Sequence, residues 1–129
     1  KDGVLQDLDG ISIHPYSTFT PDSDFKAIEH FEEHLRAMNA GRKVDLYISE
    51  MGYSDSLRGK LLPSQQKNYT KRYYQLAKSH DFIKGIWWYS LQDVNIPHNS
   101  YESNFGMLDA SGNEKDIMQG YLSWLREEN

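Results

Sequence analysis

Residues 44–53 read VDLYISEMGY, and this stretch decides the fold. Apolar side chains take every second position of its first half: Val44, Leu46 and Ile48. Because side chains of a strand alternate with period two, these residues and Glu50 are expected on one face. The stretch predicts a strand over 44–50 that ends in a carboxylate before the chain turns at Gly52. Barrel enzymes use such strands, because their chemistry sits at the C-terminal ends of the strands.

The rest of the chain alternates expected strands and helices. Two further strands are expected over 9–16 and 83–91. Helices are expected over three segments: 25–40, 63–79 and 115–127. The segment 83–91 is apolar on both faces, which marks a strand covered on both sides in a parallel sheet. The alternation indicates an α/β fold of parallel βαβ units, either part of a barrel or a small open sheet.

The length of the chain limits its architecture. The 129 residues are enough for a single domain with a core, which we expect to span 1–129. A complete eight-stranded barrel needs about 250 residues, roughly twice this length. The loop expected over 92–113 is too long for a simple connection, and loops of this length are often functional.

Composition excludes several classes of protein and site. The net charge of −5 provides no basic field for nucleic acid or an anionic membrane. No stretch approaches the roughly 20 apolar residues of a membrane span. The chain has no cysteine, which excludes disulfides, thiolate catalysis and zinc–thiolate sites but leaves the compartment open. The first residues lack the apolar core of a signal peptide, so a secreted or periplasmic parent protein is an expectation without a sequence signal.

Three strand tips carry residues suited to a sugar site. The first offers His14 and Tyr16, the second Glu50 and the third Trp88. If the strands are adjacent and parallel, these tips converge on one rim. A carboxylate can attack or stabilise an oxocarbenium-like carbon, and a phenol can donate to that carboxylate. An indole supplies a flat apolar face for a pyranose ring.

Each of these residues also has an ordinary structural interpretation. Glu50 alone could be a solvated acid at a strand end, and His14 alone a hydrogen-bonded structural histidine. Trp87 and Trp88 alternate in direction, so one of them is expected to pack against helices. The four-residue spacing of two histidines on the first helix lacks a third ligand nearby, so no metal and no cofactor are expected.

Four segments, in order, resemble parts of the clan A glycoside hydrolases, which are (β/α)8 barrels. Residues 9–16 resemble the sixth strand with its His-x-Tyr pair, and 46–53 resemble the seventh strand with the catalytic nucleophile. Residues 86–93 look like the eighth strand, where a tryptophan forms the floor of the sugar subsite. Residues 104–115 look like the segment before the last helix. The Trp-Tyr-x-Leu-x-Asp run followed by Asn-Phe-Gly is closest to the family 39 type and related exopolysaccharide hydrolases.

The resemblance implies a partial TIM barrel, with strands six to eight of the parent domain. It implies a retaining O-glycoside hydrolase that acts on a poly- or oligosaccharide, with Glu50 as the nucleophile. It also implies substrate-binding residues: His14, Tyr16 and Trp88, with Tyr53 and Asp93 as further contacts at the rim.

The sequence departs from the family in one respect. The family's general acid/base is a glutamate that follows an asparagine on the fourth strand, which this chain lacks. Its Asn113–Glu114 pair lies in the turn before the final helix, where a structural role is expected. Because a retaining mechanism needs two carboxyl groups about 5–5.5 Å apart, the chain alone is expected to be inactive. Self-association, a missing N-terminal half or another chain is expected to cover its open edges.

Two alternative functions stay open at this point. The first is a non-catalytic carbohydrate-binding or scaffold half-barrel, in which the same residues hold a sugar without turnover. The second is a different barrel enzyme that uses Glu50 as a general base, although no Gly-rich phosphate loop supports it. The sugar, the linkage and the choice between endo and exo action do not follow from the sequence.

Overall fold

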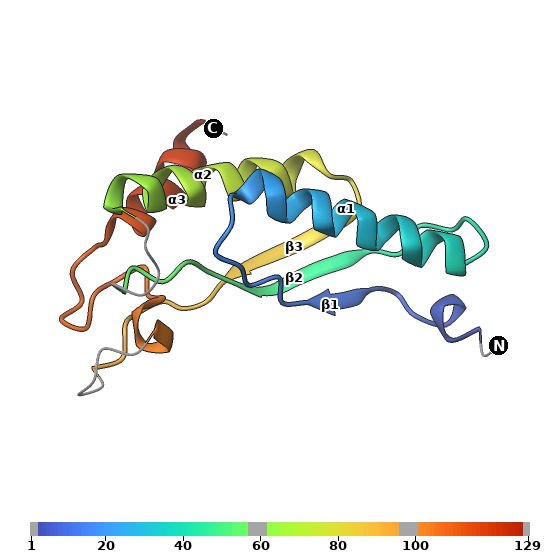
Figure 1. Cartoon of the computed structure of the whole chain (residues 1–129), viewed down its shortest axis with the longest axis horizontal. Coiled ribbons are helices and arrows are strands. Elements are labelled where there is room, and N and C mark those ends of the chain that lie inside the picture. The colour runs from blue at the N-terminus through green and yellow to red at the C-terminus, as the bar shows by residue number, and fades with distance from the viewer. Residues whose placement is uncertain (1–2, 57–61, 96–100, 128–129) are drawn as a thin grey trace.

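The computed structural model describes residues 3–56, 62–95 and 101–127 (Figure 1). Its strands are β1 (Ile11–Ile13), β2 (Leu46–Met51) and β3 (Ile83–Trp88). They form one sheet in the order β1-β2-β3, and both neighbouring pairs are parallel. The helices that follow these strands are α1 (Pro21–Met38), α2 (Pro63–Ser79) and α3 (Asp116–Glu127). The predicted α/β fold of three parallel βα units is therefore confirmed.

The helices cover one face of the sheet. Figure 1 shows α1 and α2 side by side over the strands, with α3 beyond α2. Leu46 and Ile48 are 0% exposed between these layers, where they belong to the same core as Phe25 of α1 and Tyr73 of α2. Trp87 of β3 is 54% exposed, because it points to the opposite face, away from the helices. A layer covered on one side only is what a sector of a barrel looks like.

Two predicted strands are shorter in the structure than the sequence suggested. β1 ends at Ile13 because the chain turns at Pro15, which has no N–H for the ladder, and Tyr16 N–H donates to His14 O at 2.9 Å. β3 ends at Trp88, not at residue 91. Ser90 N–H donates instead to Phe105 O at 3.1 Å, so the chain beyond β3 pairs with its own returning loop.

The first helix begins four residues earlier than predicted. Thr20 caps it, since its side-chain oxygen accepts a hydrogen bond from Ser23 N–H at 3.3 Å. Pro21 occupies the first turn, where a missing N–H costs nothing. Residues 17–24 are rich in turn-forming residue types, which favours a turn rather than the start of a helix.

Helices α2 and α3 pack closely through aromatic rings and one glycine. Tyr74 stacks on Trp124 with ring centroids 4.8 Å apart. A Cβ atom on Gly120 would lie only 2.3 Å from the carbonyl oxygen of Lys67, so this position requires glycine. Among the described helices, none has the length and hydropathy needed to cross a membrane.

Candidate functional site

An irregularity in β2 determines where Glu50 points. Ile48 pairs with Ile86 and Met51 with Trp88, so β2 has one more residue than β3 over this interval. Such a bulge re-aims the side chains beside it. Met51, which is 1% exposed, takes the next buried position after Ile48, and Glu50 turns to the open face. The expectation that Glu50 continues the face of Val44, Leu46 and Ile48 is therefore wrong, since it assumed unbroken alternation.

The bulge brings Glu50 to the residues that follow β1. The Tyr16 hydroxyl donates a hydrogen bond to Glu50 Oε2 at 3.0 Å. His14 Nδ1 lies 3.6 Å from the same oxygen, and its Nε2 lies 3.0 Å from Ser49 Oγ. Ser49 is also hydrogen-bonded to Ser12 of β1. His14, Tyr16 and Glu50 therefore meet at the C-terminal end of the parallel sheet.

The Tyr16 phenol is held in its neutral form. Burial raises the pKa of Tyr16 well above its ordinary value of 10.0, and the hydrogen bond to the Glu50 carboxylate raises it further. A neutral phenol keeps its proton and so remains a donor. A donor that contacts a carboxylate stabilises the negative charge on that carboxylate.

A cavity of about 300 Å³ opens beside the Glu50 carboxylate. Its walls come from the ends of β1, β2 and β3 and from the short 3-10 helix η2 (Tyr101–Asn104): Tyr16, Glu50, Tyr89, Tyr101, Glu102 and Phe105. Phe105 is buried and meets three tyrosine rings edge-on, with centroids 5.0–6.0 Å away. Aromatic walls with a few polar groups are typical of small-ligand sites.

Tyr89 reaches this cavity because glycine allows a close approach. Tyr89 N–H donates to Met51 O at 2.7 Å, which ties the end of β3 to the end of β2. A Cβ atom on Gly52 would lie 2.3 Å from Tyr89 O and 2.8 Å from the Phe105 ring. Any larger side chain at Gly52 would push Tyr89 away from Glu50.

Trp88 faces the helices rather than the cavity. Its indole packs against the hydrophobic core and lies 6.2 Å from the Tyr53 ring, and Trp88 Nε1–H donates to Phe105 O at 3.0 Å. The neighbouring Tyr89 points the other way and lines the cavity. The structure therefore does not bring Trp88 to Glu50, and the prediction that one of the two strand tryptophans packs against helices fits Trp88.

Tyr53 and Asp93 occupy structural positions away from the cavity. Tyr53 is 2% exposed, and its hydroxyl donates to Asp24 Oδ2 at 3.0 Å. Asp24 also accepts from Ser17 Oγ at 2.5 Å, and burial raises the pKa of its carboxyl despite these two donors. Asp93 is 10% exposed and pairs with Lys115 Nζ at 2.8 Å. Tyr53 ties the segment after β2 to α1, and Asp93 ties its loop to Lys115; neither residue is among those that line the cavity beside Glu50.

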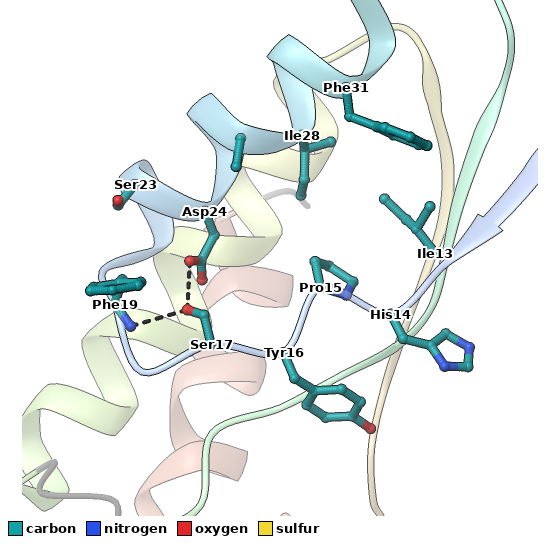
Figure 2. Close-up of a pocket in the computed structure, with 11 residues that line it drawn as sticks. Ile13, His14, Pro15, Tyr16, Ser17, Phe19, Ser23, Asp24, Ile28 and Phe31 are labelled. Carbon is teal, nitrogen blue, oxygen red and sulfur yellow. Dashed lines mark hydrogen bonds between the residues drawn. The ribbon is translucent and has the colours of Figure 1, made fainter. Parts of the chain in front are cut away.

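A larger groove of about 500 Å³ lies along the outer edge of β1 (Figure 2). Apolar side chains from β1, the segment after it and α1 line most of it: Ile13, Pro15, Phe19, Ala27, Ile28 and Phe31. His14 and Tyr16 also line this groove, and Figure 2 shows the His14 imidazole and the Tyr16 phenol pointing away from α1. Although larger, it suits packing rather than chemistry. Among the described residues, no group of three or more His, Asp or Glu is arranged to hold a metal ion.

The sequence missed four residues of the cavity. Tyr89 lies within the strand expected over 83–91, where Trp88 is the expected sugar platform. Tyr101, Glu102 and Phe105 lie in the long loop expected over 92–113. The length of that loop was the only sequence signal for Tyr101 and Glu102, whose positions depend on hydrogen bonds to distant segments, whereas Phe105 belongs to the Asn-Phe-Gly motif.

Comparison with known proteins places this arrangement among barrel structures. No family model and no curated protein sequence matches the chain. A family 39 glycoside hydrolase from the gut symbiont Bacteroides cellulosilyticus WH2 superposes with a TM-score of 0.68 and 25% identity, over 96% of this chain and 28% of that one. The chain has the fold of part of a glycoside hydrolase barrel. It spans less than a third of that structure's length.

Structures from other glycoside hydrolase families fit equally well. GH5_18 from Bifidobacterium longum subsp. infantis gives a TM-score of 0.67 with 18% identity, over 92% of this chain and 30% of that one. A GH2 beta-galacturonidase from Eisenbergiella tayi gives 0.67 with 14% identity, over 92% and 24%. The predicted partial TIM barrel is confirmed, but these similar scores do not single out the family 39 type.

Proposed function

We propose that this chain supplies the nucleophile side of the active site of a retaining O-glycoside hydrolase. The observation that carries the proposal is the hydrogen bond from the Tyr16 hydroxyl to Glu50 Oε2, at 3.0 Å, beside a cavity at the C-terminal end of a parallel sheet. Barrel enzymes place their chemistry at this end of the sheet. The glycoside hydrolase fold of the chain supports the same assignment.

In the proposed first step, Glu50 Oε1 attacks the anomeric carbon while Oε2 keeps the hydrogen bond from Tyr16. A carboxylate–carbon bond forms, the glycosidic C–O bond breaks, and a second carboxylic acid protonates the departing oxygen. In the second step that carboxylate removes a proton from water, the water oxygen attacks the same carbon, and Glu50 leaves as a carboxylate. Two inversions give overall retention of configuration.

Other residues in and beside the cavity position the sugar. His14 lies 3.6 Å from the nucleophilic carboxylate and can donate to a sugar hydroxyl or to Glu50. The rings of Tyr89 and Phe105 form apolar walls on which a pyranose face packs. The substrate class is a poly- or oligosaccharide, and the Asn-Phe-Gly and Trp-Tyr-x-Leu-x-Asp motifs favour an enzyme of the family 39 type.

The acid/base carboxylate is proposed to come from outside this chain. The described residues place one further carboxylate at the cavity, Glu102, but it lies on a short helix in a loop rather than at a strand end. The chain alone is therefore expected to lack turnover, while the full-length protein hydrolyses its substrate.

Chemical rescue tests the role of Glu50. In the full-length protein, Glu50→Ala is expected to lower kcat by at least about 10³-fold, because no covalent intermediate forms. Added azide should restore turnover and give a glycosyl azide with inverted configuration, since azide occupies the space of the lost carboxylate. The matched control, Glu114→Ala, removes an exposed carboxylate from the turn before α3 and should keep wild-type rates. Wild-type rates in Glu50→Ala would rule out the proposal.

A further inference from the structure

We propose that Glu102 sets the charge specificity of the cavity beside Glu50, so that neutral or ammonium-bearing sugars bind in preference to sugars that carry a carboxylate. The inference rests on the proposed function and deepens it by naming a substrate class. It concerns a residue that no motif of the sequence pointed to.

Two hydrogen bonds fix the position of Glu102 relative to Glu50. Ser54 Oγ donates to Tyr101 O at 2.7 Å, at the start of η2. Asp55 N–H donates to Asn104 O at 3.1 Å, at the end of η2. Both donors belong to the segment that directly follows β2, the strand that carries Glu50. Because both ends of η2 are tied to this segment, Glu102 is held at the cavity that Glu50 lines.

The charged groups that line the cavity have a single sign. Glu50 and Glu102 are carboxylates, and no Lys or Arg of the described ranges lines the cavity with them. The other lining residues are three tyrosines and Phe105, none of which supplies a positive charge. A sugar carboxylate would meet two like charges here, whereas hydroxyl and ammonium groups can donate to both.

Specificity against an anionic sugar therefore depends on repulsion as well as on favourable contacts. Glu50 is needed for bond breaking with every substrate, so its charge cannot be tuned independently. Glu102 lies on a loop helix, and its charge can change without removing the proposed nucleophile. Glu102→Gln keeps the size of the side chain and its hydrogen-bonding capacity, and it removes one negative charge.

The test compares paired aryl glycosides that differ only at C6, such as glucoside with glucuronide and galactoside with galacturonide, in the full-length protein. The readout is the ratio of kcat/KM for the uronide to kcat/KM for the neutral sugar. Glu102→Gln is expected to raise this ratio about tenfold, and Glu102→Lys to raise it further. Glu33→Gln, which removes an exposed charge from α1, should leave the ratio unchanged.

Two kinetic results would overturn the inference. One is an unchanged ratio in both Glu102 variants. The other is an equal loss of kcat on both sugars, by about 10²–10⁴-fold in Glu102→Gln, because that would make Glu102 the general acid/base.

Binding separates this inference from the proposed function. Dissociation constants of the same paired sugars are measured for wild type, Glu102→Gln and Glu33→Gln by titration calorimetry. If no form hydrolyses a glycoside but Glu102→Gln still shifts the binding ratio towards the uronide, the proposed function fails and the inference holds. If wild type and Glu102→Gln have the same binding ratio, or neither binds any of the sugars, the inference is wrong.

Discussion

Tyr16 has the most specific contact of any residue around Glu50. Its hydroxyl reaches the carboxylate at 3.0 Å, and its ring packs edge-on against Phe105 with centroids 5.6 Å apart. The ring contact would persist without the hydroxyl. The hydrogen bond can therefore be tested separately from the packing.

Tyr16→Phe is expected to lower kcat of the full-length protein by about 10- to 100-fold, because a hydrogen bond to a charged group contributes about 1.5–3 kcal/mol. The melting temperature should change little, since the ring is retained. Steady-state kinetics and thermal unfolding measure the two effects. Tyr121→Phe on α3 is the matched control, because that ring packs against Tyr74 and is not among the residues that line the cavity. Unchanged kcat in Tyr16→Phe would show that the contact does not assist the chemistry.

Asp24 makes the stability of the folded chain depend on pH, in a direction that follows from its pKa. Burial raises the pKa of its carboxyl above the unfolded value of 3.8, so the folded state favours the protonated form. The stability from this group is therefore fully present below about pH 3.8 and is lost as pH rises through the raised folded pKa. Asp24→Asn cannot ionise and should become more stable relative to wild type from pH 4 to pH 7.

Urea unfolding of both forms at matched protein concentration measures this difference. The gap in unfolding free energy, variant minus wild type, should widen as pH rises. A gap that narrows over the same range would mean that the hydrogen bonds from Ser17 and Tyr53 outweigh the cost of burying the charge.

The sequence predicted the residues around Glu50 better than it predicted their directions. Glu50, His14 and Tyr16 lie together as expected, because strand order and parallel pairing bring the strand ends to one edge. The prediction that the Glu50 side chain shares the face of Leu46 and Ile48 was wrong. It failed because the bulge in β2 cannot be recognised from the alternation of apolar and polar residues. Tyr89 rather than Trp88 lines the cavity, because Trp88 faces the helices and Tyr89 points the other way.

At the scale of elements, the contact between α2 and α3 depends on Gly120. A Cβ atom there would lie 2.3 Å from Lys67 O and 3.0 Å from Thr70 Cβ, both on α2. Gly120→Ala should therefore force the two helices apart and destabilise the chain by about 1–3 kcal/mol, the usual cost of overpacking. This loss should exceed the gain of up to about 1 kcal/mol that alanine brings to a helix interior.

Urea unfolding measures the effect. Gln119→Ala is the control, because its side chain is exposed on the same helix. If Gly120→Ala is more stable than wild type, helix propensity outweighs packing and the close approach of α2 and α3 is not as described.

Element types were predictable from the sequence, and their ends were less so. Hydrophobic periodicity identified each strand and helix that the structure contains at 83–88, 63–79 and 116–127 to within a few residues. The start of α1 depended on capping by Thr20, and the end of β1 on Pro15. The position of η2 was not predictable, since hydrogen bonds to Ser54 and Asp55, almost 50 residues away in sequence, determine it.

At the scale of the whole molecule, the groove beside β1 is an apolar surface with no covering element in the described chain. Phe19 is 68% exposed at one end of it, and Phe31 is half-exposed. Apolar patches of this kind mark interaction surfaces or aggregation sites. We therefore expect the isolated chain to self-associate, as its open strand edges also favour.

Light scattering coupled to size-exclusion chromatography tests this expectation over a range of concentrations. Wild type should show a mass above 15.0 kDa that grows with concentration. The double variant Phe19→Glu/Phe31→Glu should shift the distribution towards monomer, whereas Glu33→Lys on the exposed side of α1 should not. A compact monomer of wild type that persists on dilution and concentration would contradict the account.

The whole-molecule architecture followed from the order of the strands and helices, together with the motifs they carry. The alternation of elements left a barrel sector and an open sheet equally possible. The choice of a barrel sector over an open sheet depends on the similarity to solved glycoside hydrolase structures. This chain spans 22–31% of the length of those structures.

Covalent trapping identifies the residue that attacks the sugar. The full-length protein is incubated with a 2-fluoro glycoside that bears a good leaving group, and the labelled peptide is identified by mass spectrometry. We expect one added glycosyl group per protein, on Glu50, and none in Glu50→Gln. A label on any other residue, or hydrolysis of the parent glycoside with inversion of configuration, would contradict the proposed role of Glu50.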